Sequence, residues 1–191
     1  MTASRRRQHG FTLTELLVTV AIIGVLSVLA ISLLRANPRP VDVASQVSSK
    51  LAETSRKAVV GGAVRGDVAA AQGSKARTRA VFTVAASAVT LTVQRLEEDP
   101  TPAVTASWFT LSEVQLHRTV LLSGYMPSAD LTGGATAPAV ALGTGDSFEI
   151  RCNPDGTCDG ITVYLAADKG QRKARVVVLP LGGTPMTFDR W

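Results

Sequence analysis

The chain has 191 residues and a mass of 20.0 kDa, a size that fits one modest globular domain plus an appendage. Its formal net charge of +5 would suggest a nucleic-acid partner, but three of the basic residues lie together at positions 5–7, ahead of an apolar block. Without these three arginines, 17 basic residues face 15 acidic ones and the balance falls to +2. The overall charge therefore gives no argument for a polyanionic partner.

The N-terminal apolar block extends from Phe11 to Leu34. Its 24 residues contain one charge, Glu15, and no proline. A helix of this length crosses a hydrocarbon core of about 30 Å, and the arginines before it keep the N-terminus in the cytoplasm. An ordinary secretory signal has a shorter apolar region and an A-x-A-like cleavage site, and no such site precedes Arg35. A simple uncleaved membrane anchor is the alternative.

The carboxylate of Glu15 is the unusual feature of this block, because a charge inside a membrane helix costs free energy and usually marks a function. Glu15 lies one helical turn after Phe11, about 6 Å along the helix axis. At that position it can neutralise a positive charge at a helix N-terminus, its own or a neighbour's. The simpler alternative is an interfacial carboxylate that reaches the lipid headgroups.

The residues around the start of the block form a specific signature. A short basic leader, residues 1–10, ends at Gly10, and Phe11 follows with Glu15 one turn later. With the apolar helix beyond, this arrangement resembles the N-terminus of type IV pilins and type II secretion pseudopilins, although Thr14 stands where an apolar residue is more common. The resemblance implies that a prepilin peptidase cuts after Gly10 and that Phe11 is N-methylated. It also implies that Glu15 pairs with the Phe11 amine of a neighbouring subunit.

A proline-rich break at residues 37–40 ends the apolar helix, since proline lacks the amide donor and restricts the residue before it. A second helical pattern follows, with small and apolar residues at a spacing of three and four, and it resembles the outer half of a long pilin helix. Gly61 and Gly62 are expected to end it. Residues 61–79 are rich in Gly and Ala, carry four basic residues, and are predicted to form a mobile basic loop.

Strands are predicted for most of the remaining chain, because apolar and polar residues alternate at 89–94, 114–122 and 161–165. The more continuously apolar run at 175–179 is predicted to be a central strand.

The predicted fold is therefore α+β and pilin-like, with a long N-terminal transmembrane helix packed on an antiparallel β-sheet domain. The expected divisions are a removed leader at 1–10, a transmembrane and assembly helix at 11–34, the outer amphipathic half of the helix at 35–60, and a β-rich head at 61–191.

Cys152 and Cys158 flank a Pro-Asp-Gly turn, and in an exported protein such a close pair indicates a local disulfide. The strand that ends in this turn resembles the late part of the GspH and FimT minor pilins and pseudopilins. Asn153, Asp155 and Asp159 place oxygens on the same turn, as a Ca²⁺ site would, but they lack the spacing of an EF-hand loop. We therefore expect no metal and no other cofactor.

No enzyme signature is present in the sequence. His117 is the only histidine outside the leader, and its neighbours alternate as they would around an exposed strand position. The chain has no nucleophile elbow, no phosphate-binding loop of the P-loop type and no zinc-protease motif. The chain is predicted not to be an enzyme.

The resemblance to GspH implies a minor pseudopilin, a structural subunit of the type II secretion pseudopilus that serves protein export. The implied partners are other pilins or pseudopilins, the prepilin peptidase, the inner-membrane assembly platform and membrane lipid. The implied location is the bacterial inner membrane, crossed once, with the C-terminal domain in the periplasm. The alternative is a FimT-like type IV minor pilin that acts in pilus biogenesis or DNA uptake. Such proteins carry a basic Gly-Arg-x-Arg motif, which residues 170–175 resemble only distantly. DNA is therefore not an expected partner.

Overall fold

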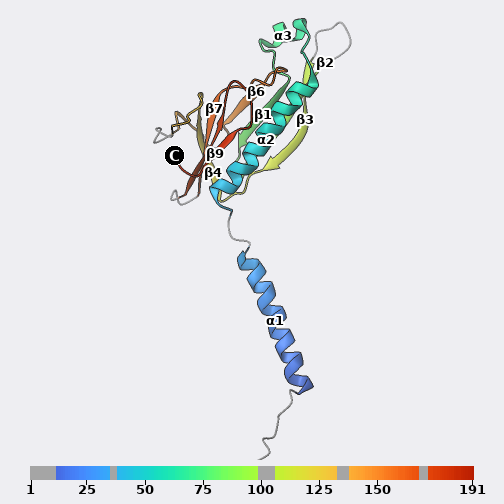
Figure 1. Ribbon diagram of the computed structural model, residues 1–191, viewed down its shortest axis with the longest axis vertical. Coiled ribbons are helices and arrows are strands. Elements are labelled where there is room, and N and C mark those ends of the chain that lie inside the picture. The colour runs from blue at the N-terminus through green and yellow to red at the C-terminus, as the bar shows by residue number, and fades with distance from the viewer. Residues whose placement is uncertain (1–11, 35–37, 99–105, 133–137, 168–171) are drawn as a thin grey trace, which may run out of the picture. The chain divides into compact units, whose positions relative to one another are not determined.

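The computed structural model describes residues 12–34, 38–98, 106–132, 138–167 and 172–191, with the side chains of positions 29 and 31–34 left out (Figure 1). The chain forms two compact units, Met1–Asn37 and Pro38–Trp191. We describe each unit by itself.

In the described part of the first unit, residues 13–34 form the helix α1 (Leu13–Leu34). Its described large apolar side chains, between Leu13 and Val28, are each more than half exposed and surround the helix. A helix that is apolar on all sides needs an apolar environment or helical partners to cover it. Within the described part of the chain, no helix combines the length and the hydropathy needed to cross a membrane.

The second unit begins with the amphipathic helix α2 (Pro40–Gly61). Proline is favourable at the first helical position, and the Asp42 carboxylate accepts a hydrogen bond of 3.0 Å from the Arg39 amide. One stripe of the helix is buried: Val43, Ala44, Val47, Ser48, Leu51, Thr54 and Ala58. The helix ends where Gly62 adopts a φ of 69°, a conformation that favours glycine.

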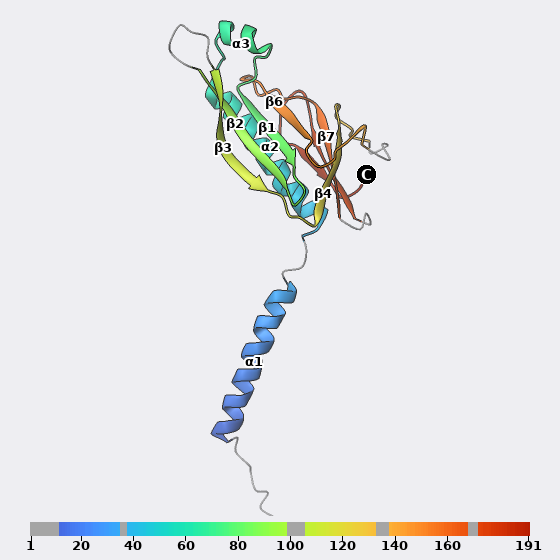
Figure 2. The same cartoon turned by 180° about the vertical axis from the view of Figure 1, so that it is seen from behind.

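The strands form two antiparallel sheets (Figures 1 and 2). The first has the order β3 (Ala106–Gln115), β2 (Val89–Glu98), β1 (Thr78–Val84) and β6 (Ser147–Cys152). The second has the order β5 (Val140–Ala141), β4 (Val120–Met126), β7 (Ile161–Ala167), β8 (Lys173–Val178) and β9 (Met186–Phe188). A short helix, α3 (Gly66–Gln72), connects α2 to β1.

The core lies between α2 and the two sheets, and α2 contacts strands of both. An aromatic stack links the sheets: the Phe148 ring of β6 lies 4.7 Å from Phe82 of β1 and 4.5 Å from Tyr125 of β4, centroid to centroid. The buried stripe of α2 and the inward side chains of the strands thus form one hydrophobic cluster.

The α+β class and the antiparallel pairing agree with the sequence prediction, and β8 lies inside its sheet between β7 and β9 as expected. Two local predictions are wrong. Residues 61–79 are not simply a loop, because they contain α3 and the start of β1. Residues 114–122 do not form one strand either: β3 ends at Gln115 and β4 begins at Val120 in the other sheet.

Candidate assembly helix and disulfide hairpin

Glu15 forms a reciprocal capping box with Thr12 at the start of α1. The Thr12 amide and hydroxyl both donate to Glu15 Oε2, at 2.9 and 3.1 Å, and the Glu15 amide donates to Thr12 Oγ1 at 3.2 Å. This is the Thr-x-x-Glu form of a helix start, in which two orphan amides are satisfied by side chains. The spacing of Thr12 and Glu15 signals the capping box, which our sequence analysis missed.

The capping box places a negative charge where the helix dipole is positive, in the first turn of α1. Among the described residues, the hydrogen bonds found for the Glu15 carboxylate all use Oε2 and all come from Thr12. The carboxylate is exposed, so a cationic partner can approach it. Gly10 and Phe11, the predicted processing residues, lie outside the described residues.

The hydroxyls of Thr19 and Ser27 form hydrogen bonds within α1. The Thr19 hydroxyl donates to the Glu15 carbonyl, and the Ser27 hydroxyl donates to the Ile23 carbonyl at 2.7 Å. Such bonds to the carbonyl four residues earlier hide a polar group from an apolar environment. Glu15 is the only charged residue in the sequence of α1.

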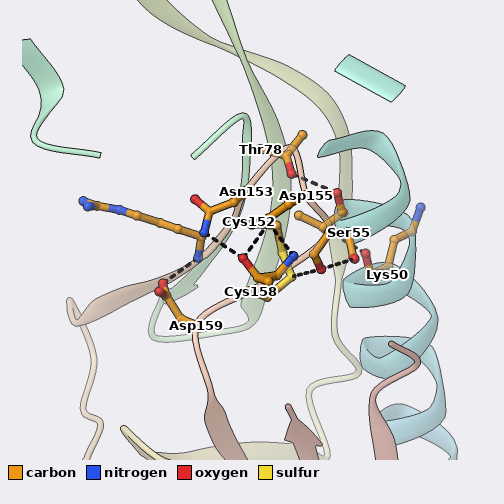
Figure 3. The surroundings of a disulfide bond; sticks show 12 residues. Lys50, Ser55, Thr78, Cys152, Asn153, Asp155, Cys158 and Asp159 are labelled. Atoms are coloured by element: carbon orange, nitrogen blue, oxygen red, sulfur yellow. Dashed lines mark hydrogen bonds between the residues drawn. A yellow bond between two sulfur atoms is a disulfide. The ribbon is translucent and has the colours of Figure 1, made fainter. Parts of the chain in front are cut away.

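In the head, Cys152 and Cys158 are joined by a disulfide, with Cα atoms 4.0 Å apart, which confirms the predicted bridge (Figure 3). The residues between them form a tight hairpin turn. The Asn153 amide donates to the Thr157 carbonyl at 2.7 Å, and the Gly156 amide donates to the Asn153 carbonyl at 3.0 Å. Gly156 has a φ of 86°, which explains glycine at this corner.

The oxygens that suggested a cation site take part in hydrogen bonds of the hairpin. Asp155 Oδ1 accepts from the Thr157 amide at 2.9 Å and from its hydroxyl at 2.6 Å, and these bonds lower the pKa of Asp155. Asp159 Oδ2 accepts from the Arg151 amide at 2.8 Å. In the described part of the chain, no three His, Cys, Asp or Glu side chains are grouped as metal ligands would be.

The disulfide hairpin lies against the C-terminal half of α2. The Ser55 hydroxyl donates to the Gly156 carbonyl at 3.2 Å, and both residues line a depression of about 520 Å³. Exposed apolar side chains border this depression, including Val60 and Leu181, which are 88% and 90% exposed. Exposed apolar side chains gathered at one place are a common feature of protein contact surfaces.

The remaining sequence candidates are His117 and the basic residues of segment 170–175. His117 is exposed, as predicted, but lies in the turn between β3 and β4 rather than on a strand, and its Nδ1 is 2.8 Å from the Thr119 hydroxyl. In the segment that distantly resembles a Gly-Arg-x-Arg motif, Arg175 is buried over the Phe188 ring and Lys173 lies over the Trp191 ring. Among the described residues of this segment, Arg172 is the one exposed basic residue. The remaining two residues of that segment, 170 and 171, lie outside the described residues.

Among known protein families, one family model matches the N-terminal segment of this chain. Residues 5–31 match the family model described as the prokaryotic N-terminal methylation motif. The matched segment contains the end of the basic leader, the capping box of Thr12 and Glu15, and most of α1. The N-terminus of this chain is therefore similar to that of prepilin-type proteins, in agreement with the resemblance seen in its first residues.

A comparison with curated proteins gives no match. Among solved structures, the chain is similar to the minor pseudopilin EpsH from the Type 2 Secretion System of Vibrio cholerae. The TM-score is 0.45 and the sequence identity 14%, over 76% of this chain and 93% of that chain.

Proposed function

We propose that this chain is a GspH-like minor pseudopilin, a structural subunit that joins a type II secretion pseudopilus through its N-terminal helix. The observation that carries the proposal is the methylation motif at residues 5–31, which includes most of an apolar helix whose single charged residue is Glu15. An isolated helix that is apolar on every side leaves its side chains uncovered in water. A filament core, in contrast, covers such helices by packing them against one another.

Before assembly, the apolar segment anchors the chain in the bacterial inner membrane, with the head in the periplasm. The arginines at positions 5–7 orient the segment, and the prepilin peptidase removes the leader after Gly10. The Cys152–Cys158 disulfide suits an oxidising compartment.

During assembly, the inner-membrane platform transfers α1 from lipid into a bundle of helices from other pseudopilins. Cleavage leaves a charged amine at Phe11, and an unpaired charge in an apolar bundle is costly. The Glu15 carboxylate of a neighbouring subunit offsets that cost and sets the axial register between subunits. The Thr12 hydroxyl and amide hold this carboxylate at the helix start until the amine replaces them.

In the assembled filament, the head provides the specific contacts. The border of the depression beside the disulfide hairpin, with Val60 and Leu181 exposed, is the surface we assign to a neighbouring head. The FimT-like alternative depends on an exposed basic motif, and the burial of Arg175 gives it no support.

Deletion of this chain in a host that carries both a type II secretion system and a competence pilus tests the proposal. We expect export of secreted enzymes to fall while DNA uptake is unchanged. Loss of DNA uptake with normal export would instead establish the FimT-like function. Restoration of export by the wild-type chain is the control.

A further inference from the structure

A depression of about 680 Å³ lies at the N-terminal end of α2. It is lined by residues 39–41 at the start of α2, by residues 172 and 173 at the start of β8, and by residues 189–191 after β9. Four basic side chains contribute to it, and one carboxylate, Asp189. The basic residues are Arg39, Arg172, Lys173 and Arg190. We call this surface the basic depression.

The basic depression has an excess of positive charge that local pairing does not remove. In the described part of the chain, no ion pair joins Arg39, Arg172 or Lys173 to a carboxylate. Arg190 lies 3.7 Å from Asp189, but both side chains are more than three-quarters exposed, so this contact is weak. On the first sheet, in contrast, Arg77 and Arg79 are paired at 2.7 Å with Glu98 and Glu149.

An aromatic side chain lies at the edge of the same depression. The Trp191 indole donates to the Leu165 carbonyl at 3.3 Å, and its ring packs edge-on against Tyr164 with centroids 5.0 Å apart. Lys173 Nζ lies 3.9 Å from the centroid of the same ring. Basic side chains beside a half-exposed tryptophan are typical of surfaces at the boundary between water and lipid.

We propose that the basic depression binds the phosphate headgroups of anionic lipids before the subunit enters a filament. The inference rests on the proposed membrane anchoring of α1. Arg39 is five residues after the last residue of α1, and five residues of extended chain reach at most about 18 Å. Each basic side chain near a membrane surface strengthens binding to anionic lipid by about fivefold.

Nucleic acid carries the same phosphate chemistry, but the basic depression suits it less well. Single-stranded nucleic acid is bound by aromatic rings on which successive bases stack. Among the described residues, Trp191 is the one aromatic residue that lines the depression, and Tyr164 and Lys173 already cover parts of its ring. The short connection between α1 and Arg39 also favours lipid, because binding of nucleic acid would not require it.

The test uses the full chain in nanodiscs, with Trp108→Phe so that Trp191 is the only tryptophan. One set of discs contains phosphatidylcholine alone, and the other contains phosphatidylcholine and phosphatidylglycerol. A spin label on the lipid headgroups quenches tryptophan fluorescence at the membrane surface. We expect quenching of Trp191 to be at least about twofold stronger in anionic discs, and the difference to vanish near 1 M salt, where the Debye length is about 3 Å.

Two double variants locate the effect. The double variant Arg172→Gln, Arg190→Gln is expected to abolish the difference in Trp191 quenching between the two kinds of disc. It keeps Lys173, which contacts the Trp191 ring. Arg56→Gln with Lys75→Gln removes the same charge elsewhere on the head and is expected to keep the difference. Arg56 is 17 residues after Arg39, which is about 25 Å along the axis of α2.

Equal quenching in the two kinds of disc, or equal loss in both double variants, would overturn the inference. So would binding of a duplex oligonucleotide that depends on Arg172 and Arg190 without any effect of anionic lipid. Extraction of the chain by alkaline carbonate measures insertion separately. A chain that is extracted contradicts the proposed membrane anchoring itself, and the inference falls with it.

Discussion

Substitution of Glu15 by glutamine separates the capping role that the structure shows from the assembly role that we propose for this side chain. Glutamine is accepted at the third position of a capping box, so Glu15→Gln keeps an oxygen for the hydrogen bonds from Thr12 and removes only the charge. If Glu15 serves only to begin α1, the variant assembles normally. If Glu15 neutralises the Phe11 amine of a neighbour, the variant leaves that amine unpaired in the bundle.

The expected magnitudes of the two effects differ clearly. Loss of one partner of a buried charge pair costs about 3–5 kcal/mol. Loss of a cap costs about 1 kcal/mol. The first corresponds to a decrease in incorporation of roughly a hundredfold or more, and the second to about fivefold. Thr12→Ala is the matched control, because it removes the hydroxyl that donates to Glu15 Oε2 and accepts from the Glu15 amide while it keeps the carboxylate.

The assay is quantitative mass spectrometry of sheared filaments, with the ratio of each variant to the major subunit as the readout. Intact mass of the membrane-extracted protein monitors cleavage in parallel. We expect both Glu15→Gln and Glu15→Val to be cleaved and inserted but absent from filaments, and Thr12→Ala to be present at a reduced level. Normal incorporation of Glu15→Gln would refute the charge-pairing reasoning and leave Glu15 as a helix cap.

Four further predictions follow from the same structure. In a host with prepilin peptidase, intact mass should show loss of residues 1–10 and one added methyl group on Phe11; a retained leader would contradict the proposed processing. Replacement of both Cys152 and Cys158 by alanine should lower the free energy of unfolding of the head by about 2 kcal/mol in urea titration, a modest loss because the closed loop is short. Reduction of the wild-type disulfide should lower it by the same amount, and an unchanged free energy in both experiments would show that the bridge does not stabilise the head. The Thr157 hydrogen bonds lower the pKa of Asp155 in the folded state, so their stabilisation is complete above the ordinary pKa of about 3.9 and is lost as the pH falls through the lower folded value. The protection factor of the Thr157 amide, which corrects for the intrinsic pH dependence of exchange, should fall over that range in the wild type, and an identical profile in Asp155→Asn would exclude the carboxylate as the cause. Leu51→Ala, in the buried stripe of α2, should cost about 2–5 kcal/mol of unfolding free energy, whereas Ala substitution at the exposed Val60 should cost much less, and similar losses at both would contradict the packing of α2.

Much of the molecule follows from short stretches of sequence. The apolar length of residues 11–34, the proline at position 40 and the glycines at 61 and 62 each act on the backbone or on solvation within a few residues. The Cys152–Cys158 bridge is local in the same sense, since six residues separate its ends. For such features the physical cause lies within one or two turns of chain, so the sequence alone determines them.

The tertiary structure decided what depends on residues far apart in the chain. Residues 114–122 read as one strand because alternation carries no information on which sheet each half joins. Arg77 and Arg79 belong to an ordered segment since Glu98 and Glu149 pair with them from other strands. Likewise, Arg175 is buried over Phe188, while Arg39, Arg172 and Arg190 meet at one depression although about 130 residues separate the first from the second. Burial and charge pairing of this kind arise only when the strands are assembled, which is why the sequence alone determined the apolar segment and the motif, and the fold determined the surfaces of the head.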